Sequence, residues 1–500
     1  MKLGAIVVVG GESGRPDSKR PKLIRPKLIQ DAGQDFLGDY SLACLEIAGR
    51  SMVERTVERL IAIGVEDISV VVVGKTRMPV FRSDFGKVRV HVQKAKEITP
   101  VLTQKLKEFS ADHVAHAFVV SANAYAETDM LDFFYFHLEA KQAATRAFDR
   151  QGPLALWVVD CSKADEAQLE TLMIPSEAPR ATYFIRDYVI RLNHPRDLRQ
   201  FAEDTLRGRC ESRPSGRQIR PGVWMDERAR VNRKARIVAP VFIGRGSEVK
   251  ADAVVTRFST IEKDCCIDCG TVVENSSILQ DTNVGIWLDV CRAVVCGNKI
   301  FSLDRNVAIE ISDATLMRSG SGHATHDTKP GNKVKVNFST KNKFFTKEQS
   351  AKSLWPDANI FSGAGRMSSK GPVIIMELPE QLKQGQVKTF MRDLQPLLDQ
   401  ARPCVVLDCS KIQDIDSAGV EMLLQCLELA MKRDGDLKLA AVSPASAIIL
   451  ELMRVDRLFE VFDTPEEATR SFQTFTPVST PQSQPWYATG YGLAGLNTAN

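Results

Sequence analysis

The chain has 500 residues, of which 44% are hydrophobic and 26% are charged, and its formal net charge is +4 at pH 7. This length exceeds what one hydrophobic core usually serves, so we expect about three domains. The charge is too small to indicate direct binding to nucleic acid, and no apolar run reaches the roughly 20 residues that a membrane span needs. The 11 cysteines are scattered and the N-terminus lacks an export cleavage site, which favours a cytoplasmic protein with reduced thiols.

Residues 1–206 predict an α/β domain of the nucleotide-binding kind. The run LGAIVVVGG, from Leu3, is typical of a buried strand that ends in glycines. An amphipathic helix in VERTVERLIAIG stops at Gly64 and leads into a second buried strand over 68–73. This order of strand, helix and strand indicates a Rossmann-like unit.

The details of this first domain are similar to one enzyme family. The strand with Gly10, Gly11 and Arg15, the Ala-Gly-Arg turn at 48–50 and the helix after it resemble the sugar-1-phosphate nucleotidyltransferases, or NDP-sugar pyrophosphorylases. The resemblance implies a GT-A-like fold and a nucleotide sugar as ligand. In active members it also implies Mg²⁺ held by two carboxylates, because two phosphate-bearing anions must be brought together.

Both carboxylate positions of that family differ in this chain. Asn123 stands where the aspartate after a mid-domain strand belongs, and Arg191 takes the place of the second aspartate. The family's phosphate-binding lysine falls on Leu42 or Ala43. We therefore interpret the domain as having the nucleotidyltransferase fold without transferase activity. Binding of a nucleotide sugar is left open. Mg²⁺ is expected as a cofactor only if the domain is an active transferase.

An aliphatic residue returns at every sixth position within residues 219–311. The ten positions are Met225, Val231, Ile237, Ile243, Val249, Val255, Ile261, Ile267, Val273 and Leu279. This period fits neither a helix nor an alternating strand, and it resembles the hexapeptide repeat of left-handed parallel β-helices. In that fold three hexads close one triangular coil. The alternative is a β-sandwich with irregular turns. The phase slips by one at 280–283, which predicts a bulge or a changed turn there.

We expect this coil to be a structural spine, with self-association through it left open. Acyltransferases with such coils usually use a histidine base, and no histidine occurs between His194 and His323. Cys266 and Cys269 form a CxxC without a second ligand pair nearby, so no metal site is expected. The arginines crowded over 207–236 indicate either a solvated basic face or a seat for an acidic partner or phosphate groups.

Two segments have the composition of chains without a core. Residues 312–370 are rich in Gly, Ser, Thr, Asn and Lys and predict a flexible basic linker. Its few large apolar residues, such as Phe344 and Trp355, are either adhesive spots or a docking segment. Residues 474–500 are predicted to be a disordered tail.

Residues 371–473 alternate strands and helices and predict a small α/β domain. In VVLDCSKIQDIDSAGVEMLL a buried strand gives way to a helix at Asp416 and Ser417, and Gly419 allows a close approach in its first turn. The pattern resembles the STAS domain of anti-sigma-factor antagonists. The resemblance implies that Ser417 is phosphorylated by a partner serine kinase that is itself the anti-sigma factor.

The loop of Asp414, Asp416, Ser417 and Gly419 is therefore the predicted switch, although an Asp-Ser pair before a helix is also an ordinary helix cap. Phosphate would add about −1.5 to −2 charges to this acidic loop. We predict a cytoplasmic regulator whose dephosphorylated form binds an anti-sigma factor or kinase. The alternatives are an active sugar nucleotidyltransferase governed by the STAS domain, and a scaffold for polysaccharide-synthesis enzymes.

Overall fold

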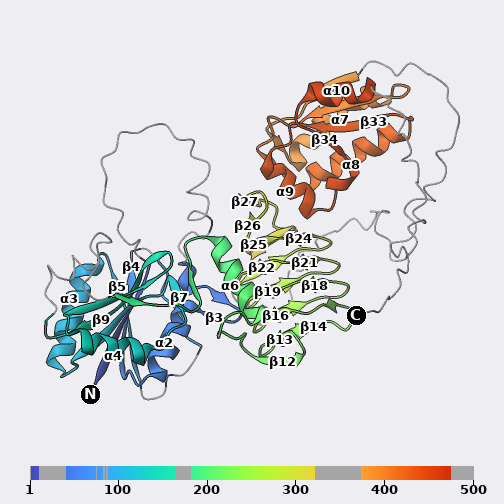
Figure 1. Cartoon of the computed structure of the whole chain (residues 1–500). Helices are drawn as coiled ribbons and strands as arrows, with labels where there is room; N and C mark the ends of the chain where they lie inside the picture. The colour runs from blue at the N-terminus through green and yellow to red at the C-terminus, as the bar shows by residue number, and fades with distance from the viewer. Residues whose placement is uncertain are drawn as a thin grey trace, which may run out of the picture.

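A computed structural model describes most of the chain in three units that follow one another in sequence (Figure 1). The described residues are 2–10, 36, 41–74, 76–82, 85, 88–163, 182–320 and 373–473. Gly11 and Arg15, most of the predicted linker and the predicted tail lie outside them. No described helix is long and apolar enough to cross a bilayer.

The N-terminal unit is built on a seven-stranded sheet in the order β10-β8-β9-β6-β1-β4-β5. These strands are β1 (Leu3–Val9), β4 (Asp67–Val73), β5 (Arg89–Ala95), β6 (His116–Ser121), β8 (Ala144–Asp149), β9 (Gly152–Asp160) and β10 (Thr182–Phe184). The central strand β1 pairs in parallel with β4 and β6, whereas β9 is antiparallel to β6 and β8. Side chains of β1 alternate between two cores, with Val7 in one and Ile6 in the other.

Helices and short strands complete this unit. They are η1 (Leu42–Cys44), β2 (Glu46–Ile47), β3 (Arg50–Ser51), α2 (Met52–Ala62), α3 (Ile98–Ala111), β7 (Ala124–Ala126), α4 (Met130–Ala140), β11 (Val189–Arg191) and α6 (Pro195–Arg207). Helix α2 ends next to Gly64, whose φ of +90° is readily adopted by glycine alone. The expected helix stop is therefore where the chain turns towards β4.

The middle unit, here called the coil, spans 217–319, and its strands form three sheets in which strands of successive turns lie side by side. Its strands are β12 (Arg217–Arg220), β13 (Val223–Met225), β14 (Arg230–Val231), β15 (Arg236–Ile237), β16 (Val241–Ile243), β17 (Glu248–Val249), β18 (Val254–Thr256), β19 (Ser259–Ile261), β20 (Cys266–Ile267), β21 (Val272–Glu274), β22 (Ser277–Ile278), β23 (Thr282–Val284), β24 (Asp289–Cys291), β25 (Ala293–Cys296), β26 (Lys299–Ser302), β27 (Val307–Glu310) and β28 (Met317–Ser319). Val223 pairs in parallel with Val241, and Val241 with Ser259, so one turn takes 18 residues, or three of the six-residue repeats. Ile243 and Ile261 are fully buried inside.

The shift in phase lies earlier than 280–283, where it was predicted. Val255 pairs with Val273 at the full spacing of one turn, whereas Ile261 pairs with Ile278, one residue short of it. The missing residue belongs to the corner around Asn275, which has a φ of +47°. Ile278 therefore takes the interior position and Leu279 points into the core of the N-terminal unit. Two adjacent apolar residues gave no signal in sequence for which one faces inward.

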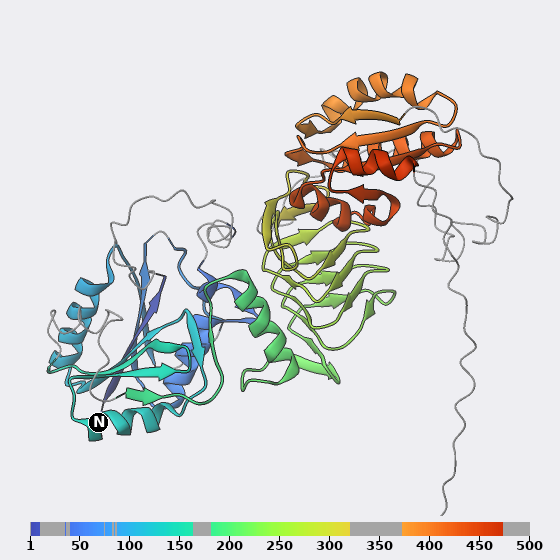
Figure 2. The ribbon, with the colours of Figure 1, turned by 45° about the horizontal axis from the view of Figure 1, so that its top comes forward.

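The coil also extends past residue 311, the boundary predicted from composition. Strand β28 pairs antiparallel with β23, with Met317 opposite Val284. Met317 and Leu316 are buried and belong to the core of the coil. The first residues assigned to the linker therefore form the last side of the coil, at the end nearest the C-terminal unit (Figures 1 and 2).

The C-terminal unit has a four-stranded parallel sheet in the order β29-β31-β33-β34. Its elements are β29 (Val373–Glu377), β30 (Gln381–Leu382), α7 (Gln384–Leu398), β31 (Cys404–Asp408), β32 (Asp414–Ile415), α8 (Ser417–Met431), β33 (Asp436–Ala440), α9 (Pro444–Leu452), η3 (Asp456–Leu458), β34 (Glu460–Phe462) and α10 (Pro465–Gln473). Val405 and Leu407 of β31 pack into the core shared with α7 and α8, whereas Val406 faces Phe472 of α10. Helices therefore cover both faces of the sheet.

Candidate regulatory site at the start of helix α8

Helix α8 begins at Ser417, and its cap is the residue before it. The Asp416 side chain accepts a hydrogen bond from the backbone N–H of Gly419 at 2.8 Å. Its other oxygen accepts from the N–H of Gln384, at the start of α7, at 3.1 Å. One carboxylate thus serves two helix starts, and the Ser417 hydroxyl is left free of the capping role.

Gly419 is buried in the first turn of α8, where the helix passes close to β30. A Cβ built at this position would lie 2.2 Å from the carbonyl oxygen of Leu382. Leu382 pairs with Ile415 in the two-stranded sheet that precedes the helix. The close approach that the sequence predicted for Gly419 is therefore to β30, and it fixes where Ser417 is presented.

The half-buried Ser417 makes its polar contacts with the coil. Its hydroxyl donates to Oδ2 of Asp313 at 2.5 Å, and its backbone N–H donates to the same oxygen at 3.1 Å. The other oxygen of Asp313 accepts from the N–H and hydroxyl of Thr315, at 2.8 and 2.6 Å. A carboxylate from a segment predicted as linker therefore sits at the start of α8, where the helix dipole favours an anion.

The charge around Ser417 is mostly negative. Burial would raise the pKa of Asp313, but the hydrogen bonds from Ser417 and Thr315 outweigh it, and this pKa is lowered. Asp414 forms an ion pair with Lys383 at 2.6 Å and accepts weakly from the Ser312 hydroxyl at 3.3 Å. The structure thus brings together all four residues of the predicted switch loop and adds Asp313, which lies 104 residues away in sequence.

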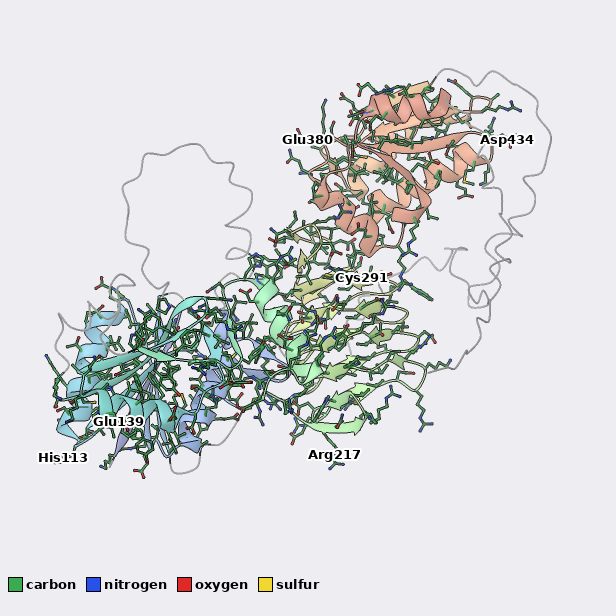
Figure 3. All side chains as sticks on the ribbon, viewed as in Figure 1. His113, Glu139, Arg217, Cys291, Glu380 and Asp434 are labelled. Carbon is green, nitrogen blue, oxygen red and sulfur yellow. The ribbon has the colours of Figure 1, made fainter. Side chains whose placement is uncertain are left out.

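Helix α9 also contacts the coil. Its residues Ile449 and Leu450 pack into the core of the C-terminal unit, whereas Ile448 and Leu452 belong to the core of the coil. Figure 2 shows the unit seated on the end of the coil, and in Figure 3 the labelled Cys291 marks that end. The sequence PASAIILEL is apolar on several sides, which is the signal that could have indicated burial on two faces.

Two of the residues named for the degenerate nucleotide site lie side by side. Strand β11 pairs antiparallel with β7 and places Arg191 opposite Ala124, next to Asn123. The N–H of Leu192 donates to the carbonyl oxygen of Asn123 at 2.6 Å. This main-chain contact ties the end of β11 to the turn after β6, so the two positions are held together by backbone. Gly10, at the end of β1, has a φ of +73°.

The side chain of Arg191 is already engaged within the unit. Its guanidinium donates to both oxygens of Asp149, at 2.7 and 2.8 Å, and this pairing lowers the pKa of Asp149. The two positions predicted from sequence to replace carboxylates thus carry an amide, on Asn123, and a cation that is already paired, on Arg191. Among the residues that the structure describes, no cluster of three or more His, Cys, Asp or Glu side chains could hold a metal ion.

The Ala-Gly-Arg turn at 48–50 contacts the coil. The N–H groups of Ala48 and Gly49 donate to the two carboxylate oxygens of Glu262, at 2.8 and 2.9 Å. Nearby, Arg82 forms an ion pair with Asp226 at 2.7 Å. Burial raises the pKa of Glu262 to about 8. The turn that pointed in sequence to a phosphate-handling enzyme is thus part of the junction between two units.

The C-terminal unit, with its parallel sheet, helices on both faces and a serine at the start of α8, is a small α/β domain. The family model for the STAS domain matches residues 366–468, so this part of the chain is a STAS domain. Many solved structures also match the chain. One is a crystal structure at 1.59 Å of a candidate anti-sigma factor antagonist from Thermotoga maritima, with 21% identity, a TM-score of 0.19, and coverage of 20% of this chain and 88% of that one. A search of curated proteins found no match.

Proposed function

We propose that this protein is a regulator whose STAS domain works as a phospho-switch like those of anti-sigma-factor antagonists, with Ser417 as the modified residue. The observation that carries the proposal is that the Ser417 hydroxyl lies at the start of α8 without capping it. Asp416 holds the helix start in place, so a change at Ser417 leaves the cap intact. The residue can therefore change its charge without unfolding the domain that presents it.

Electrostatics gives this change a large effect on a partner. Phosphate on Ser417 would add about −1.5 to −2 charges at a helix N-terminus, which accommodates an anion. The same charge would stand beside Asp414 and Asp416, making an acidic surface strongly acidic. A partner that binds the unmodified loop through complementary shape and modest charge would be repelled.

The partner that fits this proposal is an anti-sigma factor that is also a serine kinase. To test it, candidate kinases are incubated with the full chain and ATP, the phosphate is mapped by mass spectrometry, and binding is measured by pull-down. Ser417→Ala should keep binding and take up no phosphate, whereas Ser417→Asp should lose binding at least 10-fold. The exposed Ser410, in the same domain, supplies the matched control Ser410→Asp, which should bind normally. Equal binding of Ser417→Ala and Ser417→Asp would end the proposal.

We further propose that the N-terminal unit is a nucleotidyltransferase-like domain that binds a nucleotide sugar without turning it over, and that the coil is a left-handed β-helix. Support comes from Asn123 and from the pairing of Arg191 with Asp149. The test is to supply Mg²⁺, each nucleoside triphosphate and sugar 1-phosphates, and to measure pyrophosphate. No release is expected. Turnover that disappears in Asn123→Ala would instead establish the alternative, a transferase governed by the STAS domain.

A further inference from the structure

We propose that the end of the coil is an intramolecular binding surface for the switch face of the STAS domain, and that a phosphate on Ser417 releases the domain from it. The inference rests on the proposed function in taking Ser417 as the modified residue. It adds a partner within the same chain, which competes with any external protein for the same hydroxyl.

The first observation is that Asp313 occupies the place that a phosphate would need. One oxygen of Asp313 accepts hydrogen bonds from both the hydroxyl and the backbone N–H of Ser417. Its other oxygen is held by Thr315, so the carboxylate is fixed in direction. An anion from the coil therefore already binds the start of α8, and a second anion at the same position is excluded by charge and by space.

Phosphorylation would remove this contact and replace it with repulsion. In the kinase reaction a bond forms between Ser417 Oγ and the γ-phosphorus of ATP, the bond from that phosphorus to the oxygen of ADP breaks, and the hydroxyl proton passes to the base of the kinase. The hydrogen bond that the Ser417 hydroxyl donates to Asp313 is then lost, and a dianion stands beside the Asp313 carboxylate. The nearby cation Lys383 already forms an ion pair with Asp414, so it does little to offset the repulsion between the phosphate and Asp313.

The second observation is that apolar packing and a cation support the same surface. Ile448 and Leu452, on one side of α9, are 3% and 1% exposed and lie in the core of the coil. The Arg454 guanidinium donates to the carbonyl oxygens of Gly270 and Leu288, at 3.1 and 3.0 Å. These carbonyls belong to successive turns of the coil, so the Arg454 side chain binds two turns at once.

A third contact places a charge pair at the rim. Arg305, which follows β26, forms an ion pair with Glu451 of α9. The surface thus combines an apolar centre, a polar rim and the Ser417 contact at one side, as protein interfaces commonly do. Since the two partners belong to one chain, docking is an intramolecular equilibrium that a local change of charge can shift.

Docking has a direct consequence for access to the switch. The hydroxyl of Ser417 donates to Asp313 in the docked form, so a kinase reaches it only after the domain leaves the coil. An external partner that recognises the unmodified loop meets the same obstacle. The docked form is therefore closed to both, and phosphorylation holds the domain in the open form.

The test is hydrogen exchange of the full chain, without kinase or partner. Amides of 445–454 and 312–317 should exchange at least 10-fold faster in Ser417→Asp than in the unmodified chain, because these segments form the docked surface. Ser410→Asp should leave them protected. The double variant Asp313→Arg with Ser417→Asp should restore protection, since opposite charges then face each other.

Amides of β31, inside the STAS core, report whether the domain stays folded in each variant. If they lose protection in Ser417→Asp, the same comparison is made on the chain phosphorylated by a kinase. If the amides of 445–454 stay fully protected in the Ser417→Asp variant or in the phosphorylated chain, the inference is overturned. The proposal that Ser417 is phosphorylated would be unaffected by that result. Release by Ser417→Asp in a chain that no kinase modifies would instead preserve the docking surface and defeat the proposed function.

Discussion

At the scale of single residues, the start of α8 divides its tasks among neighbours. Asp416 caps the helix, Gly419 lets it approach β30, and Ser417 is left to face the coil. Under the proposed function, this division would let the charge at Ser417 change while the cap of the helix stays in place. A serine that also capped the helix would change stability and signal together.

Gly419→Ala should destabilise the STAS domain by about 1–3 kcal/mol, because the new Cβ would lie 2.2 Å from the carbonyl oxygen of Leu382 and the helix must move. Gly385→Ala, in the first turn of α7, is the matched control, since nothing lies within 4 Å of its Cβ. Hydrogen exchange of β31 amides in the full chain gives both values. A neutral Gly419→Ala would contradict the close packing described here.

Sequence alone located these residues because local rules determine them. A strand followed by Asp-Ser and a helix with a periodic apolar face places Ser417 at a helix terminus whatever surrounds it. Asp313 could not be found in the same way, because its role depends on a contact 104 residues away and its own segment has the composition of a linker. The contacts that Ser417 makes thus depend on the tertiary structure and cannot be predicted from local sequence.

At the scale of elements, the coil shows how much of a structure a periodic sequence pattern predicts. The six-residue period identified interior residues such as Ile243 and Ile261 without any tertiary information. It misplaced the change of phase, since Ile278 rather than Leu279 takes the interior position. The reason is that Leu279 is buried too, on the outside of the coil, where it packs into the N-terminal unit.

The turn at 48–50 has a role that its sequence did not indicate. Its N–H groups donate to the carboxylate of Glu262 in the coil. Burial raises the pKa of Glu262 to about 8 and that of nearby Glu46 to about 7. An acid whose pKa is raised by folding contributes stability that is present below its unfolded value, near 4.5, and is lost as the pH rises towards the folded value.

We therefore expect the melting temperature of the N-terminal unit and coil to fall between pH 6 and pH 8. Trp157 and Trp224 lie in these two units, so tryptophan fluorescence reports on them. Glu262→Gln should flatten this dependence, because the amide does not ionise. Glu274→Gln, at a more exposed ion pair with Arg257, should keep the wild-type slope. A slope unchanged in Glu262→Gln would show that the carboxyl ionises freely at the junction.

At the scale of the whole molecule, the coil stands between an N-terminal unit that it holds through Glu262 and a STAS domain that it holds through Asp313. The two junctions differ in kind. The first buries a carboxyl almost completely, whereas the second combines the buried side chains of Ile448 and Leu452 with half-buried polar groups around Ser417. The first is suited to permanence and the second to release.

Asp313→Ala should raise the initial rate of Ser417 phosphorylation in the full chain about 10-fold. Hydrogen bonds to a charged group contribute about 1.5 kcal/mol or more, and their loss increases the undocked fraction by that factor. Asp304→Ala removes a coil carboxylate that pairs with Arg292 instead, and it should leave the rate unchanged. The rate is read by mass spectrometry under limiting kinase, and equal rates for both variants would show that the coil does not shield Ser417.

The packing of α9 against the coil has one more consequence. Ile448 and Leu452 pack against the last turn of the coil. Separation of the two units would therefore expose apolar side chains on both of them to water. A detached STAS domain would therefore expose an apolar face on α9. The last turn of the coil would be uncovered and able to associate with another copy of the chain. The released molecule should be the less soluble of the two forms, and in a crowded cell it should soon associate with other chains.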